Sequence, residues 1–209
     1  AWTGSIATNE NATIEFPEIT LTGSHTFNAE VTNPNGITDE DLTNNTMSVN
    51  YEVNPSSTTP FSEDFELVTF PPSNWEIVNT DANKTWERNT SASGNGSSSA
   101  AAYMNFYSYS ATGQIDELVL PAINLTGVTA AELSFNVAYR KYDNTNYDGL
   151  KVFISEDCGL SYNTTPLYNK SGDNLATLSA SMSAFVPSAA GDWRNETIDL
   201  SAYENSIIT

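Results

Sequence analysis

The chain is poor in the residues from which many catalytic and disulfide-bonded sites are built. Its 209 residues include one cysteine, Cys158, and one histidine, His25. A single cysteine excludes an intramolecular disulfide framework and a zinc site made of cysteines. The two residues fall in different predicted domains, so a Cys–His nucleophile pair would need a contact between domains. We expect Cys158 to be buried or to lie in a turn beside acids, and to be unreactive.

Sequence elements of common hydrolases are also absent. Neither H-E-x-x-H nor G-x-S-x-G occurs. Any two of the many acids could form the carboxylate pair of a glycosidase, but nothing in the sequence selects a pair. We therefore expect a protein that is not an enzyme and has no catalytic residues.

Basic residues are scarce as well. Seven Lys and Arg stand against 26 Asp and Glu, a formal net charge of −19. With so few cations there is no basic stripe to neutralise phosphates, which excludes nucleic acid as a partner. The acidity also disfavours anionic membrane surfaces and makes divalent cations, calcium first, the natural small partners.

Long apolar runs are missing too. No stretch approaches the roughly 18 residues needed to cross a bilayer, and residues 1–5 show neither the basic nor the apolar region of a signal peptide. We expect a soluble chain that is internal to a longer protein and does not insert into membranes. Abundant Asn, Thr and Ser with little Lys favour an extracellular or outer-surface location.

What the sequence does contain is hydrophobic alternation with a period of two, which predicts an all-β fold. In the first 54 residues, strands are predicted at 13–16, 25–31 and 47–53, with a turn at Asn33–Gly36. About four strands fit here, fewer than the roughly seven of an immunoglobulin-like sandwich. Residues 1–54 are therefore predicted to be the C-terminal part of such a domain.

A Pro- and Ser/Thr-rich segment, 55–60, is predicted to be a linker. Beyond it, longer strands with wide loops suit a jelly-roll β-sandwich over residues 61–209. The predicted strands cover 61–68, 75–78, 117–120, 131–139, 150–155 and 193–200. The apolar register of these strands predicts six core residues: Phe65, Trp75, Leu133, Phe135, Val152 and Ile198.

Motifs in this second part occur in a specific order. They are Phe61-Ser62-Glu63-Asp64-Phe65-Glu66, Pro71-Pro72-Ser73-Asn74-Trp75, Asn79-Thr80-Asp81 with Trp86, Gln114 to Pro121, Ala131 to Tyr139, Tyr147 to Gly159, and Trp193 to Leu200. In this order they resemble the cleaved-adhesin, or choice-of-anchor J, domains. Residues 1–53 resemble, more weakly, the immunoglobulin-like segment that often precedes them, with Trp2-Thr3-Gly4 and Asn44-Asn45-Thr46 in place.

The resemblance implies a jelly roll related to the MAM domain, found in surface adhesins and exoproteases of Bacteroidetes, many of which use the type IX secretion system. It also implies further strands after Trp193 to Leu200, ending in an acidic motif. Since the sequence stops at Thr209, we expect the last strands of the domain, and part of any calcium site, to be missing.

Calcium is the cofactor that the acidic motifs suggest, because it takes six to eight oxygen ligands. By their place in the family pattern, Glu66 and Asp81 are the first candidate ligands, followed by Glu63, Asp116 and Asp148. The alternative is that these acids are solvated or cap turns.

Aromatic residues suggest a second kind of site. Tyr103, Phe106, Tyr107 and Tyr109 alternate with small polar residues, and Tyr142 and Tyr147 belong to a polar loop that follows Arg140. Exposed rings could stack on sugars. We name Tyr142, Tyr147 and Arg140 as candidate ligand-binding residues. Trp75, Trp86 and Trp193 are expected in the core.

Two functions remain. The first is an adhesion module of a large secreted or cell-surface bacterial protein, which binds a glycan or a host or environmental surface protein. The second is a structural spacer or accessory domain of a secreted exoenzyme such as a metalloprotease. In both, the chain would contact other domains of its parent protein and the secretion machinery.

Overall fold

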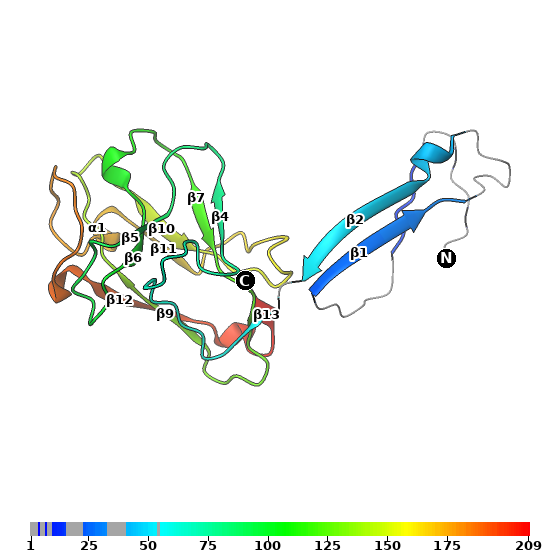
Figure 1. Ribbon diagram of the computed structural model, residues 1–209. Helices are drawn as coiled ribbons and strands as arrows, with labels where there is room; N and C mark the ends of the chain where they lie inside the picture. Colours follow the sequence, from blue (N-terminus) through cyan, green and yellow to red (C-terminus); the bar gives the residue numbers. More distant parts are fainter. Residues whose placement is uncertain (1–3, 5–6, 8–9, 16–22, 33–40, 54) are drawn as a thin grey trace. The chain divides into compact units, whose positions relative to one another are not determined.

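The computed structural model describes residues 4, 7, 10–15, 23–32, 41–53 and 55–209, which form two compact units, Ala1–Pro55 and Ser56–Thr209. Strands dominate in both (Figure 1), so the predicted all-β fold is confirmed. Trp2, Phe16 and the predicted turn at 33–36 lie outside the described residues. In the described part of the chain, no helix is both long and apolar enough to cross a membrane.

The first unit contains an antiparallel strand pair. β1 (Gly23–Glu30) pairs with β2 (Thr46–Val53) from Gly23 opposite Val53 to Glu30 opposite Thr46. The 3₁₀ helix η2 (Leu42–Asn44) precedes β2, and the carboxylate of Asp41 accepts a hydrogen bond of 3.0 Å from the amide of Thr43 at its start. Both strands match predicted ones, whereas residues 13–15 form no strand.

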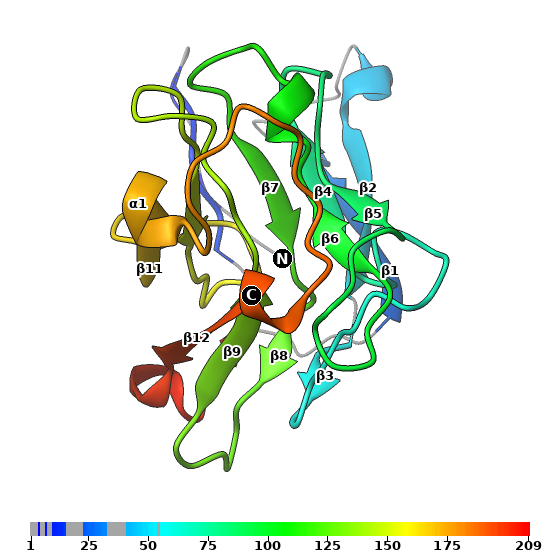
Figure 2. The same ribbon diagram turned by 90° about the vertical axis from the view of Figure 1, so that its left-hand side faces the viewer.

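The second unit consists of short strands joined by long loops (Figure 2). Its strands are β3 (Ser57–Thr58), β4 (Glu76–Asn79), β5 (Glu87–Asn89), β6 (Ala101–Tyr103), β7 (Asp116–Val119), β8 (Ile123–Asn124), β9 (Glu132–Val137), β10 (Gly149–Val152), β11 (Tyr168–Ser171), β12 (Arg194–Asp199) and β13 (Ile207–Ile208). Its helical turns are η3 (Phe106–Ser108), α1 (Gly172–Leu175), η4 (Ala190–Asp192) and η5 (Ser201–Tyr203).

These strands form five small sheets within residues 56–209, all of which are described. Antiparallel pairs join β4 to β7, β5 to β6, β9 to β12 and β10 to β11. In the fifth sheet, β8 lies between β13, which is antiparallel to it, and β3, which is parallel. Thr209 and Ser155 then exchange backbone hydrogen bonds of 2.8 and 3.0 Å, so the pairing continues from β13 to the segment after β10.

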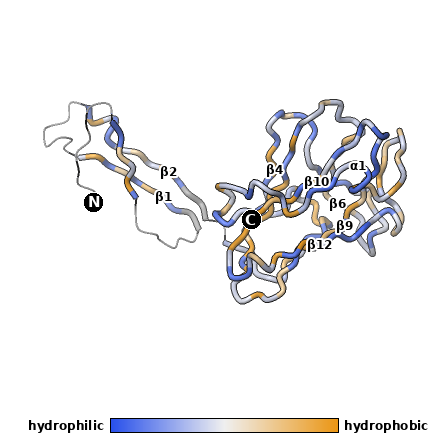
Figure 3. Tube along the Cα trace, turned by 180° about the vertical axis from the view of Figure 1, so that it is seen from behind, coloured by the Kyte–Doolittle hydropathy of each residue, from blue (hydrophilic) through white to orange (hydrophobic). Residues whose placement is uncertain are grey.

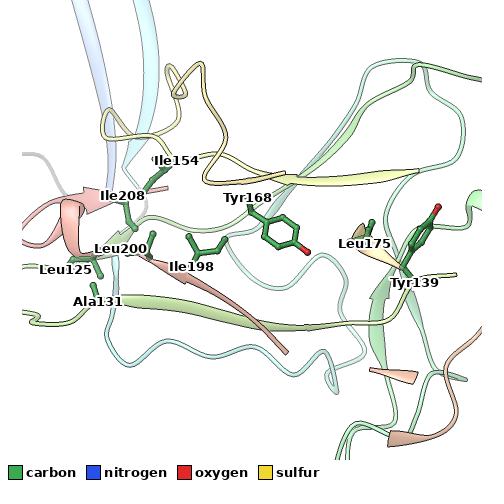
Figure 4. Packing of buried hydrophobic residues seen from close by; sticks show 9 residues of the cluster. All are labelled: Leu125, Ala131, Tyr139, Ile154, Tyr168, Leu175, Ile198, Leu200 and Ile208. Atoms are coloured by element: carbon green, nitrogen blue, oxygen red, sulfur yellow. The ribbon is translucent and has the colours of Figure 1, made fainter. Parts of the chain in front are cut away.

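The core of the second unit follows from the alternation of its strands. Hydrophobic and hydrophilic residues are interspersed along the chain rather than gathered in long runs (Figure 3), and β9 alternates between exposed and partly buried residues. The buried cluster, seen from close by in Figure 4, consists of Leu125, Ala131, Tyr139, Ile154, Tyr168, Leu175, Ile198, Leu200 and Ile208.

Four of the six predicted core residues belong to this core or pack against it. Ile198 is buried in the cluster, and Leu133, Phe135 and Val152 are partly buried against it. Phe65 and Trp75 are partly buried elsewhere, in an aromatic group with 5.8 Å between their ring centroids. Trp86 and Trp193 are also only partly buried, and their indole N–H groups bond to the carbonyls of Asp116 and Ser93.

The predicted strand at 61–68 is absent, which corrects the sequence analysis. Phe65 has φ 60°, in the left-handed region, so the backbone cannot stay extended there. The amides of Phe65 and Glu66 bond to the carboxylates of Glu63 and Asp64 at 2.6 and 3.0 Å. The Arg88 guanidinium donates hydrogen bonds to the backbone carbonyls of the same two residues, at 2.6 Å to Phe65 and 2.9 Å to Glu66. The segment is held by side chains instead of a ladder.

Candidate functional site

The segment from Tyr139 to Tyr142 follows β9 and carries two of the candidate ligand-binding residues. It lies beside the segment Thr177–Ser181, since the amide of Thr177 bonds to the Tyr139 carbonyl at 2.9 Å and the amide of Ser181 to the Lys141 carbonyl at 3.1 Å. Tyr139 and Lys141 are each 7% exposed, whereas Tyr142 is 41% exposed. Buried and more exposed positions therefore alternate, as expected when successive side chains point to opposite sides.

Tyr139 anchors this segment to the core, in the same cluster as Leu175 (Figure 4). Its ring meets that of Phe106 edge to face, with 6.4 Å between centroids. Its hydroxyl accepts a hydrogen bond of 2.7 Å from the amide of Asp148. Burial, together with the Asp148 carboxylate, raises the pKa of Tyr139 to about 12. The phenol thus stays neutral and holds the two ends of the loop 139–148 together.

Lys141 fixes the other buried position. Its ammonium donates a hydrogen bond of 2.9 Å to the side chain of Asn144 and forms an ion pair with Asp173 in α1. The Asp143 carboxylate accepts bonds from the amides of Thr145 and Asn146, both at 2.7 Å. These bonds lower the pKa of Asp143 well below its usual range. The loop that carries Tyr142 is therefore tied internally and to α1.

Tyr142 pairs with Tyr107 at the protein surface. Their ring centroids are 6.3 Å apart, the planes are tilted by 45°, and the two residues are 41% and 56% exposed. Tyr107 lies in η3, next to Phe106, whose contact with Tyr139 fixes that short helix. The predicted Tyr142 thus gains a partner from among the aromatic residues around 103–109. We call Tyr107 and Tyr142 the tyrosine pair.

Arg140 lies in the sequence between the buried residues Tyr139 and Lys141. Its guanidinium lies over the ring of Phe185, 4.7 Å from the centroid. Its Nε atom is buried without a hydrogen-bond partner, and no hydrogen bond or ion pair joins Arg140 to any of the described residues. Arg140 is a predicted ligand-binding residue, whereas no sequence signal pairs it with Phe185, which is 45 positions away in a segment without strand alternation.

Tyr147, the third candidate, has a different contact. It is 53% exposed, and its ring lies against Gly172 at the start of α1. Gly172 has φ +51°, and a Cβ atom there would come within 3.3 Å of the Tyr147 ring. Tyr147 therefore packs over a glycine, and no ring contact joins it to Tyr142 among the described residues.

The two first candidate calcium ligands bind different segments. Both carboxylate oxygens of Glu66 accept hydrogen bonds, from the hydroxyl of Ser98, the amide and hydroxyl of Ser99, and the amide of Ala100, at 2.6 to 3.1 Å. These bonds, with those from Ser99 the largest, lower the pKa of Glu66 to about 2. Glu66 thus fastens the segment 98–100 to the chain before β4.

Asp81 and Asp116 come together at one end of the β4–β7 pair. Asp81 accepts bonds from the amide of Asn83 at 3.0 Å and the hydroxyl of Tyr109 at 2.5 Å. The pKa of Tyr109 is raised to about 12, chiefly by the hydrogen bond to Asp81 and then by burial and by the charges of Asp81 and Asp116. Asp116 stands opposite Asn79 in the strand register, and both have a buried Oδ1 atom without a hydrogen-bond partner. The hydroxyl of Thr85 is a third such oxygen in the same turn region.

The last two candidate ligands, Glu63 and Asp148, bond to other residues than Asp81 and Asp116 do. Glu63 bonds to the amide of Phe65. Asp148 accepts a hydrogen bond of 3.3 Å from the hydroxyl of Tyr139, and burial raises its pKa. Among the described residues, no three carboxylate, histidine or cysteine side chains gather closely enough to hold a metal. The predicted ligand set is therefore not one cluster, and calcium stays a prediction.

A pocket of about 340 Å³ lies elsewhere, along the loop after β10. It is lined by Ile154, Glu156, Asp157, Ser161, Tyr162 and Asn163. Asp157 is bonded to the hydroxyls of Ser155 and Ser161 at 2.7 and 2.6 Å, and bonds from these two residues lower its pKa to about 2. Cys158 is exposed in the same loop with φ 60°, so the predicted turn beside acids is found.

Comparisons of the chain with protein-family models, with curated proteins and with solved structures found no match. Its function has to be inferred from its own residues.

Proposed function

We propose that this chain is a non-catalytic ligand-binding module of a large secreted or cell-surface bacterial protein, of the cleaved-adhesin type, and that it binds glycans through the tyrosine pair. The observation that carries the proposal is the pairing of Tyr107 and Tyr142 at 6.3 Å with both rings left 41% or more exposed. Tyrosine presents an apolar face and a polar edge, which suits the faces and hydroxyls of sugars.

The surroundings of the pair support recognition rather than incidental exposure. Each tyrosine follows a residue that is held by other contacts. Tyr107 follows Phe106, which packs against Tyr139. Tyr142 follows Lys141, which binds Asn144 and Asp173. A site whose supporting residues are already held loses little freedom when a ligand binds. Export through type IX secretion, and a location outside the cell, belong to the same proposal and rest on the motif order and on the abundance of Asn, Thr and Ser with little Lys.

A glycan array tests this proposal. The wild-type chain should bind a subset of glycans, and the Tyr107→Ala/Tyr142→Ala double variant should lose that binding while its melting temperature changes little. Tyr162→Ala is the matched control, because Tyr162 is another partly exposed tyrosine, at 38%, that lines the separate pocket. If the wild type binds no glycan, or if the double variant binds as well as the wild type, the chain is better explained as a spacer of a secreted exoenzyme.

We also propose that calcium binds at the end of the β4–β7 pair, with Asp116, Asn79 and Asp81 as ligands. The support is chemical, since carboxylate and amide oxygens are calcium ligands and a buried oxygen without a partner is costly. Asp116 and Asn79 each have such an oxygen. Bound there, the cation would hold the two strand ends together and offset some of the repulsion among the acids.

Melting curves with calcium and with chelator test this second proposal. Calcium at a hundredfold excess over its dissociation constant should stabilise the fold by about 2.7 kcal/mol. Asp116→Asn should remove this gain, whereas Glu117→Gln, at the exposed next position of β7, should keep it. A wild-type curve that does not move when calcium is added would rule out the site.

A further inference from the structure

We propose that the ligand of the tyrosine pair is an acidic saccharide whose carboxylate is bound by Arg140. This inference rests on the proposed glycan-binding function and adds the chemical class of the sugar. Arg140 and Tyr142 are two positions apart and on the same side of a segment whose intervening residue, Lys141, is buried. At a rise of about 3.3 Å per residue, two side chains on the same side of an extended segment leave it about 7 Å apart, so one ligand can reach both Arg140 and Tyr142.

The state of Arg140 is unusual for so acidic a chain. Lys141, Lys170 and Arg194 each form an ion pair, and Arg88 donates to two carbonyls. Arg140 has no such partner in the described part of the chain, although 26 acids are present. Lys84 and Lys151 have none there either, but they are exposed, whereas Arg140 is partly buried. Its buried Nε–H is an unsatisfied donor, which is costly.

Asp192, an acid whose pKa is affected by the charge of Arg140, does not satisfy this donor. The charge of Arg140 contributes weakly to the lowered pKa of Asp192, behind the backbone hydrogen bonds that are its main cause. The Asp192 carboxylate is occupied by the amides of Ser188 and Ala189, at 2.8 and 3.0 Å. No ion pair joins it to Arg140 among the described residues. The two terminal nitrogens of the guanidinium have no hydrogen bond to the described residues either and, unlike Nε, are not fully buried, so their N–H groups can meet an incoming group.

The chemistry of that edge selects a carboxylate. The Cζ atom of Arg140 lies over the Phe185 ring, 4.7 Å from its centroid, so the ring holds the planar fork of N–H groups from one side. A fork of this kind binds a carboxylate through two parallel hydrogen bonds. A net charge of −19 repels ligands with many charges, such as heavily sulfated chains. A sugar with one carboxylate per residue, a uronic acid, fits both conditions.

The test is calorimetric titration of the full chain with a galacturonate trisaccharide and with its methyl ester, in which each carboxylate is neutral. The wild type should prefer the acid over the ester by about tenfold, which corresponds to about 1.4 kcal/mol. Arg140→Gln should lose this preference and bind acid and ester equally. Arg140→Lys, which keeps the charge but not the fork, should fall between them.

Lys151→Gln is the matched control, because it removes an exposed cation from β10, a strand that carries neither tyrosine of the pair; it should keep the preference. Equal binding of acid and ester by the wild type, or a preference that survives in Arg140→Gln, overturns the inference. Binding of neutral glycans alone does so too, but leaves the proposed function intact, whereas no glycan binding at all removes both. Tighter binding of a poly-glutamate peptide than of the saccharide would instead assign Arg140 to a protein partner.

Discussion

Lys170 on β11 donates a hydrogen bond of 2.6 Å to the buried carboxylate of Glu196 on β12, which connects two strands of different sheets. Arg194 binds the same carboxylate at 2.7 Å and also donates to the carbonyls of Leu175 and Ala176 at the end of α1. Charged hydrogen bonds around Glu196 thus join β11, β12 and α1, which are not paired with one another as strands of one sheet.

Glu196→Gln should destabilise the second unit by about 1 to 3 kcal/mol, because it removes the charge that two cations share at a buried position. The lower end of that range applies since Lys170 and Arg194 are each partly exposed. Urea unfolding followed by tryptophan fluorescence measures the loss. Glu132→Gln, on the exposed side of β9, is the control and should change stability by less than about 0.5 kcal/mol. An equal effect of both variants would contradict the assignment.

Glu66 should make stability depend on pH in a defined window. Its pKa is about 2 in the folded state against an ordinary value of 4.5. Because the folded pKa is depressed, the contribution of the ionised group is complete above 4.5 and is lost as the pH falls towards 2. The difference in melting temperature between wild type and Glu66→Gln should therefore be constant at neutral pH and shrink to nothing near pH 2.

The control for that experiment is Glu87→Gln in β5, an exposed carboxylate in the same unit. Its melting temperature should follow that of the wild type across the whole range. A difference between wild type and Glu66→Gln that does not vary with pH would mean that the bonds to Ser98, Ser99 and Ala100 do not depend on the charge.

Two isoleucines near the end of the chain should respond differently to the same truncation. Ile198 is 6% exposed and belongs to the core cluster, whereas Ile207 is 44% exposed. Ile198→Ala should cost about 3 kcal/mol through lost burial and the cavity that remains. Ile207→Ala should cost less than about 1 kcal/mol. Denaturant unfolding of both variants checks the register of β12 and β13, and a reversed order would show that register to be wrong.

Two neighbouring glycines offer a similar comparison. Gly94 has φ +89°, and a Cβ atom there would lie 2.5 to 2.7 Å from the backbone of Ala189. Gly96 has φ +61°, but an added Cβ would meet nothing within 4 Å. Gly94→Ala should therefore cost about 3 kcal/mol or more, while Gly96→Ala should cost about 1 kcal/mol from backbone strain alone. Melting temperatures measure both, and equal losses would place the segment 93–95 away from 187–189.

The accuracy of the sequence analysis depended on strand length. Alternation located β1, β2, β4, β7, β9, β10 and β12 to within a few residues, because four or more residues can show a period of two. β11 also has four residues but was not predicted, since Tyr168 is its only apolar residue. β3, β8 and β13 have two residues each. Strands this short show no detectable period in the sequence and are formed by pairing with strands from distant parts of the chain. At 61–68 the apolar spacing misled, because acidic side chains and Arg88 compete successfully for the backbone.

In the candidate sites too, local sequence predicted some features, whereas contacts between distant segments were not predicted. A polar loop was enough to predict that Tyr142 would be exposed, but its partner Tyr107 and the Phe185 ring under Arg140 come from distant segments. Glu66 and Asp81 were chosen by family position, yet the unpaired oxygens belong to Asp116 and Asn79. Asn79 is an amide, and its importance depends on facing Asp116 across the strands. Sequence order alone does not contain that pairing.

The sheet β3–β8–β13 has a consequence for synthesis. Its central strand pairs with residues 57–58 on one side and with residues 207–208 on the other. A ribosome that adds roughly 5 to 20 residues per second needs about 4 to 17 s to pass from Asn124 to Ile208. During that interval one edge of β8 has no partner from its own chain and can pair with another chain. The growing polypeptide is thus open to pairing with another chain at this edge until β13 emerges.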